Sequence, residues 1–209
     1  MEQQFQYYAF ISYKREDEKW AKWLQDRLRW YKLPSKLCRQ ITRLPKKVWP
    51  VLRDNTDLDS GRLEENIRHE LERSHYLIVI CSPEAARSPW VGKEVKYFAT
   101  LHGADKIIPF VVSGIPYSND IETECIHEQI KAISQEELLA INVREEGIGS
   151  FAMKKKRAFI RVVARLLDIK FNTLWQPYER ILRIRKWSTG IGVVFILIRF
   201  IHLVGLLPD

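Results

Sequence analysis

Apolar residues along this chain follow two different spacings, which predict strands and helices in turn. Residues 6–13 and 76–81 are apolar runs typical of strands, and the second lacks polar alternation, which indicates a strand covered on both faces. Residues 17–31 and 153–167 instead repeat apolar side chains every three or four positions, as a helix lying on a sheet does. The chain therefore begins with a predicted strand followed by a helix.

The remaining predicted elements continue the same alternation. They are strands over residues 48–52, 106–112 and 138–143 and helices over residues 63–71 and 118–132. Alternation of strands with helices favours an α/β fold built on a mostly parallel sheet with right-handed crossovers.

Two prolines bear on these predictions. Pro109 lies within the strand predicted over residues 106–112, and because proline cannot donate to a ladder, it favours an edge position or a bulge. Pro177 interrupts a helix predicted over residues 171–187, where we expect a kink.

Composition changes this picture mainly near the C-terminus. With 209 residues and 46% apolar content, the chain can bury one core, and its three cysteines fit no metal-ligand spacing. The net charge is +8, yet residues 1–150 carry 22 Lys or Arg against 23 Asp or Glu, whereas residues 151–186 carry 11 against two. No nucleic-acid motif accompanies the basic stretch, so anionic membrane lipid is the expected partner, not nucleic acid.

The apolar segment at residues 189–207 predicts a single transmembrane helix, although Arg199 lies near its middle. A buried or oligomer-forming helix is the alternative. Basic residues before the segment place the preceding domain in the cytoplasm. The expected organisation is a folded domain over residues 1–170, a basic juxtamembrane helix over 171–188 and the membrane helix.

Glu94 is the strongest candidate for chemistry. Ser88 can cap a helix that has Pro89 at its first position, so Trp90 and Glu94, four residues apart, share one helix face beyond the strand at residues 76–81. Ligands of open α/β sheets bind at the carboxyl ends of the strands. One carboxylate beside one aromatic plane suits a planar, cationic, sugar-linked substrate. The alternatives are a solvated surface glutamate and a tryptophan that only packs.

Three motifs together resemble the Toll/interleukin-receptor homology (TIR) domain family. The run Tyr8-Ala-Phe-Ile-Ser-Tyr13 is similar to the first signature box, and Arg53-Asp54 resembles the second. The segment Ser88-Pro-Trp-x-x-x-Glu94 is similar to the one that bears the catalytic glutamate in TIR domains that cleave NAD. The likeness is to bacterial TIR proteins with a C-terminal membrane segment. Ala9 departs from the family, since many members carry Asp there.

The resemblance implies a flavodoxin-like, five-stranded sheet in the order 2-1-3-4-5 with flanking helices, followed by the C-terminal hydrophobic helix, and a cytoplasmic domain at the inner membrane. Its implied activity is cleavage of NAD+ to nicotinamide and ADP-ribose or a cyclic isomer, with self-association through TIR domains and no cofactor. Glu94 would be catalytic. The implied substrate-binding residues are Trp90, Ser12, Tyr13, Lys14, Arg15, Arg53 and Asp54, of which Lys14 and Arg15 would face the pyrophosphate.

Other functions compete with this one. A non-catalytic TIR scaffold that only pairs with other TIR domains is the main alternative. The pattern at residues 147–152 fits a dinucleotide fingerprint, but it follows the fifth predicted strand, whereas the fingerprint belongs to the first βα turn. A thiol hydrolase that uses Cys81 with His75 or His127 is disfavoured, because an apolar strand end raises a thiol pKa.

Overall fold

A five-stranded, all-parallel sheet is the centre of residues 1–168, the first of two units into which the chain divides; residues 169–209 form the second. The strands are β1 (Tyr7–Ser12), β2 (Val51–Arg53), β3 (Ser74–Cys81), β4 (Ile107–Val111) and β5 (Ile141–Asn142). Their order is β2-β1-β3-β4-β5, which confirms the predicted topology. The computed structural model describes residues 5–42, 44–45, 47–53, 62–133, 140–144 and 150–176.

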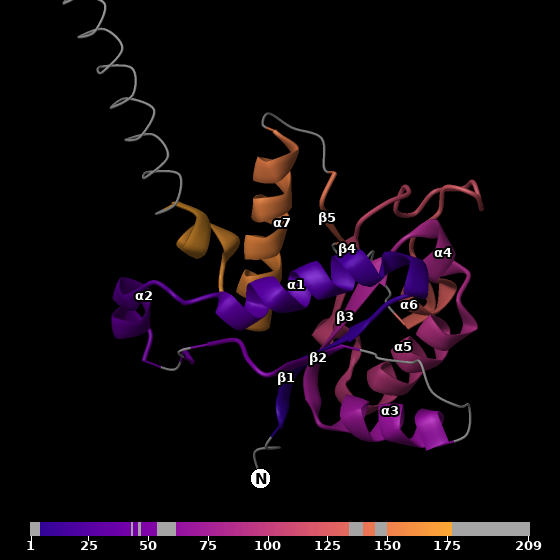
Figure 1. The fold of residues 1–209 in the computed structure, drawn as a ribbon, viewed down its shortest axis with the longest axis horizontal. Coiled ribbons are helices and arrows are strands. Elements are labelled where there is room, and N and C mark those ends of the chain that lie inside the picture. The colour runs from indigo at the N-terminus through magenta and orange to yellow at the C-terminus, as the bar shows by residue number, and fades with distance from the viewer. Residues whose placement is uncertain are drawn as a thin grey trace, which may run out of the picture. The chain divides into compact units, whose positions relative to one another are not determined.

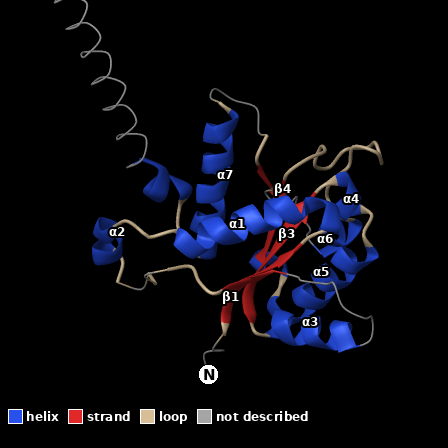
Figure 2. Ribbon diagram, viewed as in Figure 1, coloured by secondary structure: helices blue, strands red, loops and turns tan. Residues whose placement is uncertain are grey.

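The helices cover both faces of this sheet (Figures 1 and 2). They are α1 (Glu18–Trp30), α2 (Ser35–Gln40), α3 (Arg62–Glu72), α4 (Pro83–Ala86), α5 (Pro89–His102), α6 (Glu128–Ile133) and α7 (Phe151–Leu166), with short 3-10 turns at Arg15–Asp17 and Ala104–Lys106. The sequence did not predict the short helices α2 and α4.

The helices form two groups, one on each face of the sheet, and each group packs on the sheet through apolar side chains. On one face, α3, α5 and α6 pack against β1, β3 and β4 through side chains such as Leu71, Phe98 and Ile130. On the other, Trp23 of α1 stacks on Phe110 of β4 at 6.4 Å between ring centres and meets Phe159 of α7 edge-on at 6.3 Å. Burial on both faces accounts for the apolar run in β3.

Pro109 does not place β4 at the sheet edge, contrary to its sequence signal. The strand pairs with β3 on one side and β5 on the other, and Pro109 lies opposite Val79. On the β5 side only Phe110 and Val111 are paired, so that ladder begins beyond Pro109 and does not need its missing N–H.

The helix predicted over residues 118–132 is wrong for most of its length, since only α6 forms. Polar side chains bond the local backbone instead: Ser118 Oγ accepts from Asp120 N at 3.1 Å, and Asp120 Oδ1 accepts from Glu122 N at 3.0 Å. Glu124 Oε1 accepts from Ile126 N at 2.7 Å. Such bonds offer the backbone an alternative to the helical ladder.

The second unit is described only as far as residue 176. Residues 171–176 are helical, and the rings of Phe171 and Trp175 stack at 5.6 Å. The predicted membrane helix at residues 189–207 and most of the predicted juxtamembrane helix lie outside the described residues. Among the residues that the structure describes, none of the helices has both the length and the apolar character required to cross a bilayer.

Candidate active site

Glu94 lies in the second turn of α5, on the side that faces the sheet. The helix begins as predicted, with Pro89 at its first position and Ser88 before it, although the Ser88 side chain makes no capping bond. Glu94 is 5% exposed, one of few charged residues that the described chain buries. The interpretation of Glu94 as a solvated surface residue is therefore wrong.

Ser12 holds the Glu94 carboxylate. Ser12 is the last residue of β1, is fully buried, and donates a hydrogen bond from Oγ to Glu94 Oε2. Because a buried charged acceptor is costly without donors, this bond stabilises the burial of Glu94 and ties α5 to the end of the central strand. The structure thus places Ser12 against Glu94 and gives its hydroxyl no exposed surface.

A cavity of about 310 Å³ opens beside Glu94 between α3 and α5. We call it the Glu94 cavity. Trp90 also lines this cavity and is 43% exposed. The Lys93 ammonium lies over the Trp90 ring, 4.6 Å from the ring centre, as in a cation–π contact. The described lining residues are Ile67, Arg68, Leu71, Trp90, Lys93, Glu94, Lys96, Tyr97 and Thr100. An acidic group and an exposed aromatic plane therefore share one cavity, as the i, i+4 spacing predicted.

The loops after β1 and β3 are joined by a second buried hydrogen bond. Ser82 Oγ donates to Asp17 Oδ2 at 2.5 Å and accepts from Ala85 N at 3.1 Å, where it caps α4. Burial raises the pKa of the Asp17 carboxyl; the Ser82 bond opposes that rise, and the nearby charges of Glu84 and Glu16 add to it. The loops that follow β1 and β3 are therefore in direct contact.

The other predicted binding residues lie around the ends of β1 and β2. Arg53 donates from Nη1 to Glu18 Oε1 at 3.0 Å, and its guanidinium carbon lies 5.7 Å from the Tyr13 ring centre. Lys14 is half-buried and precedes the 3-10 turn that begins with the exposed Arg15. The described residues that line the Glu94 cavity do not include any of the four predicted binding residues of this group, which are Tyr13, Lys14, Arg15 and Arg53.

Asp54 and the loop at 54–61 lie outside the described residues. The prediction that Asp54 binds substrate therefore stays a prediction.

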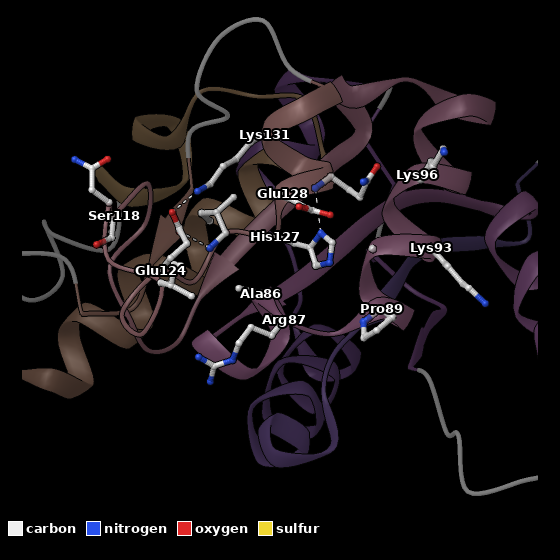
Figure 3. Close-up of a pocket in the computed structure, with 15 residues that line it drawn as sticks. Ala86, Arg87, Pro89, Lys93, Lys96, Ser118, Glu124, His127, Glu128 and Lys131 are labelled. Carbon is white, nitrogen blue, oxygen red and sulfur yellow. Dashed lines mark hydrogen bonds and ion pairs between the residues drawn. The ribbon is translucent and has the colours of Figure 1, made fainter.

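A larger cavity of about 670 Å³ lies on the other side of α5, beside α4, α6 and the loop after β4 (Figure 3). We call it the His127 cavity. His127 Nδ1 accepts from Gln129 N at 3.0 Å, and burial lowers the pKa of the ring, which favours the neutral form. The ring fits against Gly92, where an added Cβ would lie 2.5 Å from His127 Cε1. No sequence signal pairs these two residues, which are far apart in the chain.

The thiol-hydrolase alternative finds no support in the described structure. Burial raises the pKa of the Cys81 thiol well above its usual value, which leaves it protonated, and Sγ donates to Val79 O at 3.3 Å. Nowhere in the described part of the chain do three or more histidine, cysteine, aspartate or glutamate side chains gather so as to hold a metal ion.

Comparison with known proteins identifies the family. The TIR domain family matches residues 9–146, about two thirds of the chain, so the chain belongs to this family. A stretch of 65 residues is 40% identical to the NAD(+) hydrolase ApTIR of an Actinoplanes species, and it represents 31% of this chain but 9% of that relative. The TIR domains of an activated Roq1 resistosome that recognises the pathogen effector XopQ align with 13% identity and a TM-score of 0.47, over 74% of this chain and 98% of theirs.

The pH dependence of stability tests the Asp17 environment. Because the pKa of Asp17 is raised in the folded chain, folding is favoured while the carboxyl is protonated, and the free energy of unfolding falls as pH rises from the ordinary value of 3.8 through the raised pKa. Asp17→Asn keeps an acceptor for Ser82 without ionising. We expect this variant to lack that fall and to be more stable than the native chain at neutral pH.

Urea denaturation from acid to neutral pH measures this difference. Asp26→Asn, on an exposed position of α1, is the matched control and should follow the native curve. Parallel curves for the native chain and Asp17→Asn would contradict the assigned environment.

Proposed function

We propose that this chain is an NAD+ glycohydrolase that cleaves the bond between ribose and nicotinamide, with Glu94 as the catalytic carboxylate. The observation that carries the proposal is a single buried carboxylate, oriented by Ser12 and sharing a cavity with the exposed plane of Trp90. Membership of the TIR domain family and the partial match to a named NAD(+) hydrolase support it.

The chemistry requires little beyond that carboxylate. As the bond to nicotinamide breaks, positive charge of the oxocarbenium type develops on the ribose, and a nearby carboxylate stabilises that charge. Nicotinamide departs as a neutral molecule, so the leaving group needs no proton from an acid. Water then captures the ribosyl cation and loses a proton to solvent to give ADP-ribose, or the adenine ring of the same molecule captures it, with loss of a proton to solvent, to give a cyclic isomer. NAD is the substrate, and the reaction uses no cofactor.

The broader setting is proposed from the family resemblance alone. Clustering of TIR domains is the proposed trigger, and anti-phage defence or nucleotide signalling is the proposed role. A TIR scaffold without catalysis is the second candidate. The burial of Glu94 beside an aromatic cavity favours the enzyme, because a scaffold has no need for a buried carboxylate at this position.

Replacing Glu94 tests catalysis directly. Glu94→Gln keeps an acceptor for the Ser12 hydroxyl but removes the charge, so nicotinamide release from NAD+ should fall by about 10²-fold to 10³-fold. Chromatography of released nicotinamide, with purified and clustered protein, measures the rate. Glu65→Gln, an exposed position on α3, should keep full activity. Equal release from the native chain and Glu94→Gln would remove the catalytic assignment.

Ser12 should act by positioning Glu94. Ser12→Ala removes the hydroxyl that donates to Oε2, so kcat should fall roughly 10-fold to 100-fold with little change in KM. Ser74→Ala is the matched control, because Ser74 is also fully buried and donates, to Glu70 O at 2.8 Å. Ser74→Ala should lose about 1 kcal/mol of unfolding free energy, and Ser12→Ala about 1.5–3 kcal/mol, because its partner is a buried charged group. A similar kcat for both variants would show that Ser12 is only structural.

We also propose that residues 189–207 anchor the chain in the inner membrane as one helix, with the TIR domain in the cytoplasm. The support is the apolar character of that segment and the excess of basic residues in the stretch before it. Those basic side chains would each gain about 1 kcal/mol at an anionic leaflet.

Membrane fractionation tests this anchor. The full chain should stay with the membrane pellet through a high-salt wash and be released by detergent. A chain that ends at residue 188 should be released by salt, because only electrostatic attraction remains. Release of the full chain by salt would show surface attachment without insertion.

A further inference from the structure

The His127 ring packs directly on the backbone of α5. The residue is 7% exposed, and a Cβ added at Gly92 would lie 2.5 Å from His127 Cε1 and 2.7 Å from Nε2. Both distances are shorter than any van der Waals contact, so the ring fills the space that a larger residue at position 92 would need. Figure 3 shows the ring in the His127 cavity, with its bond to the backbone of α6.

The same ring is fixed by polar contacts on both helices. Nδ1 accepts from Gln129 N, in the first turn of α6, and the ring also makes a hydrogen bond with the backbone of Ser88, which precedes α5. Ser88 O in turn accepts from Gly92 N at 3.1 Å. His127 therefore joins the start of α6 to the start of α5.

Glycine at position 92 is explained by this contact and not by the backbone of α5. Gly92 lies inside a 14-residue helix and is not among the described glycines with positive φ. Glycine weakens a helix relative to alanine, so the position costs helix stability with no conformational need for it. The close approach of the His127 ring supplies the reason.

His127 and Ser12 contact α5 on opposite sides. Gly92 and Glu94 are two residues apart, which at 3.6 residues per turn is a rotation of about 200° around the helix. Accordingly, Gly92 lines the His127 cavity, whereas Glu94 lines the Glu94 cavity and accepts from Ser12. The His127 ring thus blocks movement of this part of α5 away from the end of β1.

We propose that His127 is a positioning residue that holds the first two turns of α5 in place, so that Glu94 stays on the Ser12 hydroxyl. The inference rests on the proposed function for its kinetic readout. It gives a role in catalysis to a residue that has no contact with the Glu94 cavity and lies in none of the sequence motifs.

Two substitutions of His127 separate the contact with α5 from the bond to α6. His127→Asn keeps an acceptor at the place of Nδ1 for Gln129 N but is too short to reach Gly92. His127→Gln extends an amide to the place of Nε2, beside α5. We expect kcat for nicotinamide release to fall about 10-fold to 100-fold in His127→Asn, with little change in KM, and to fall less in His127→Gln.

Urea denaturation should give the reverse order, with His127→Asn the more stable variant because it keeps the bond to α6. A purely structural role would make kcat follow stability. His69→Asn, at an exposed position on α3, is the matched control and should behave as the native chain. A kcat of His127→Asn equal to or above that of His127→Gln would overturn the proposal.

The contact with Gly92 can be tested without turnover. Gly92→Ala should lower the urea midpoint in the native chain, because the new Cβ collides with the ring. In the His127→Ala background the collision is absent and alanine favours the helix, so the same substitution should raise the midpoint. A change of the same sign in both backgrounds would overturn the contact on which the proposal depends.

Amide hydrogen exchange distinguishes failure of this proposal from failure of the proposed function. If the native chain releases no nicotinamide from NAD+, the proposed function fails. Faster exchange of the backbone amides at positions 92–95 in His127→Asn than in the native chain and His69→Asn would still support the hold on α5. Equal exchange in all three chains would overturn it.

Discussion

The hydrogen bond from Ser12 to Glu94 is the interaction on which the candidate site depends. It joins the end of the central strand β1 to the second turn of α5, between residues 82 positions apart in the chain. Because Ser12 pairs with Val79 of β3, the parallel ladder between β1 and β3 fixes the Ser12 backbone. The carboxylate is therefore oriented by the sheet, and loop movements need not displace it.

Helix α5 is buried on one side and exposed to solvent on the other, and the two sides carry different kinds of residue. Its inner side carries Val91, Val95 and Phe98 into the core, which leaves Glu94 as the charged residue among them. Its outer side carries the exposed Lys93 and Lys96. A helix held firmly by apolar packing thus carries a buried acid on its inner side and exposed lysines on its outer side.

Much of this architecture could be predicted from the chain, and the failures have physical causes. The apolar runs located β1, β3 and β4 to within two residues at each end, and the spacing of Trp90 and Glu94 correctly predicted that they share one space. The helix expected over residues 118–132 failed because side chains such as Asp120 bond the local backbone, which outweighs a modest apolar pattern. The edge position suggested by Pro109 is wrong because the neighbouring strand β5 is short. It pairs only with Phe110 and Val111, so no ladder bond to β5 requires an N–H from Pro109.

By itself, the sequence determined the order of elements, the apolar faces that make an α/β sheet, and the helix start that sets Glu94 in a second turn, because all of these depend on residues close together in the chain. Only the tertiary structure decided that Ser12 would hold Glu94, that Asp17 would meet Ser82, and that His127 would lie against Gly92. Such contacts depend on how distant segments pack, and short-range spacing carries no information about that packing.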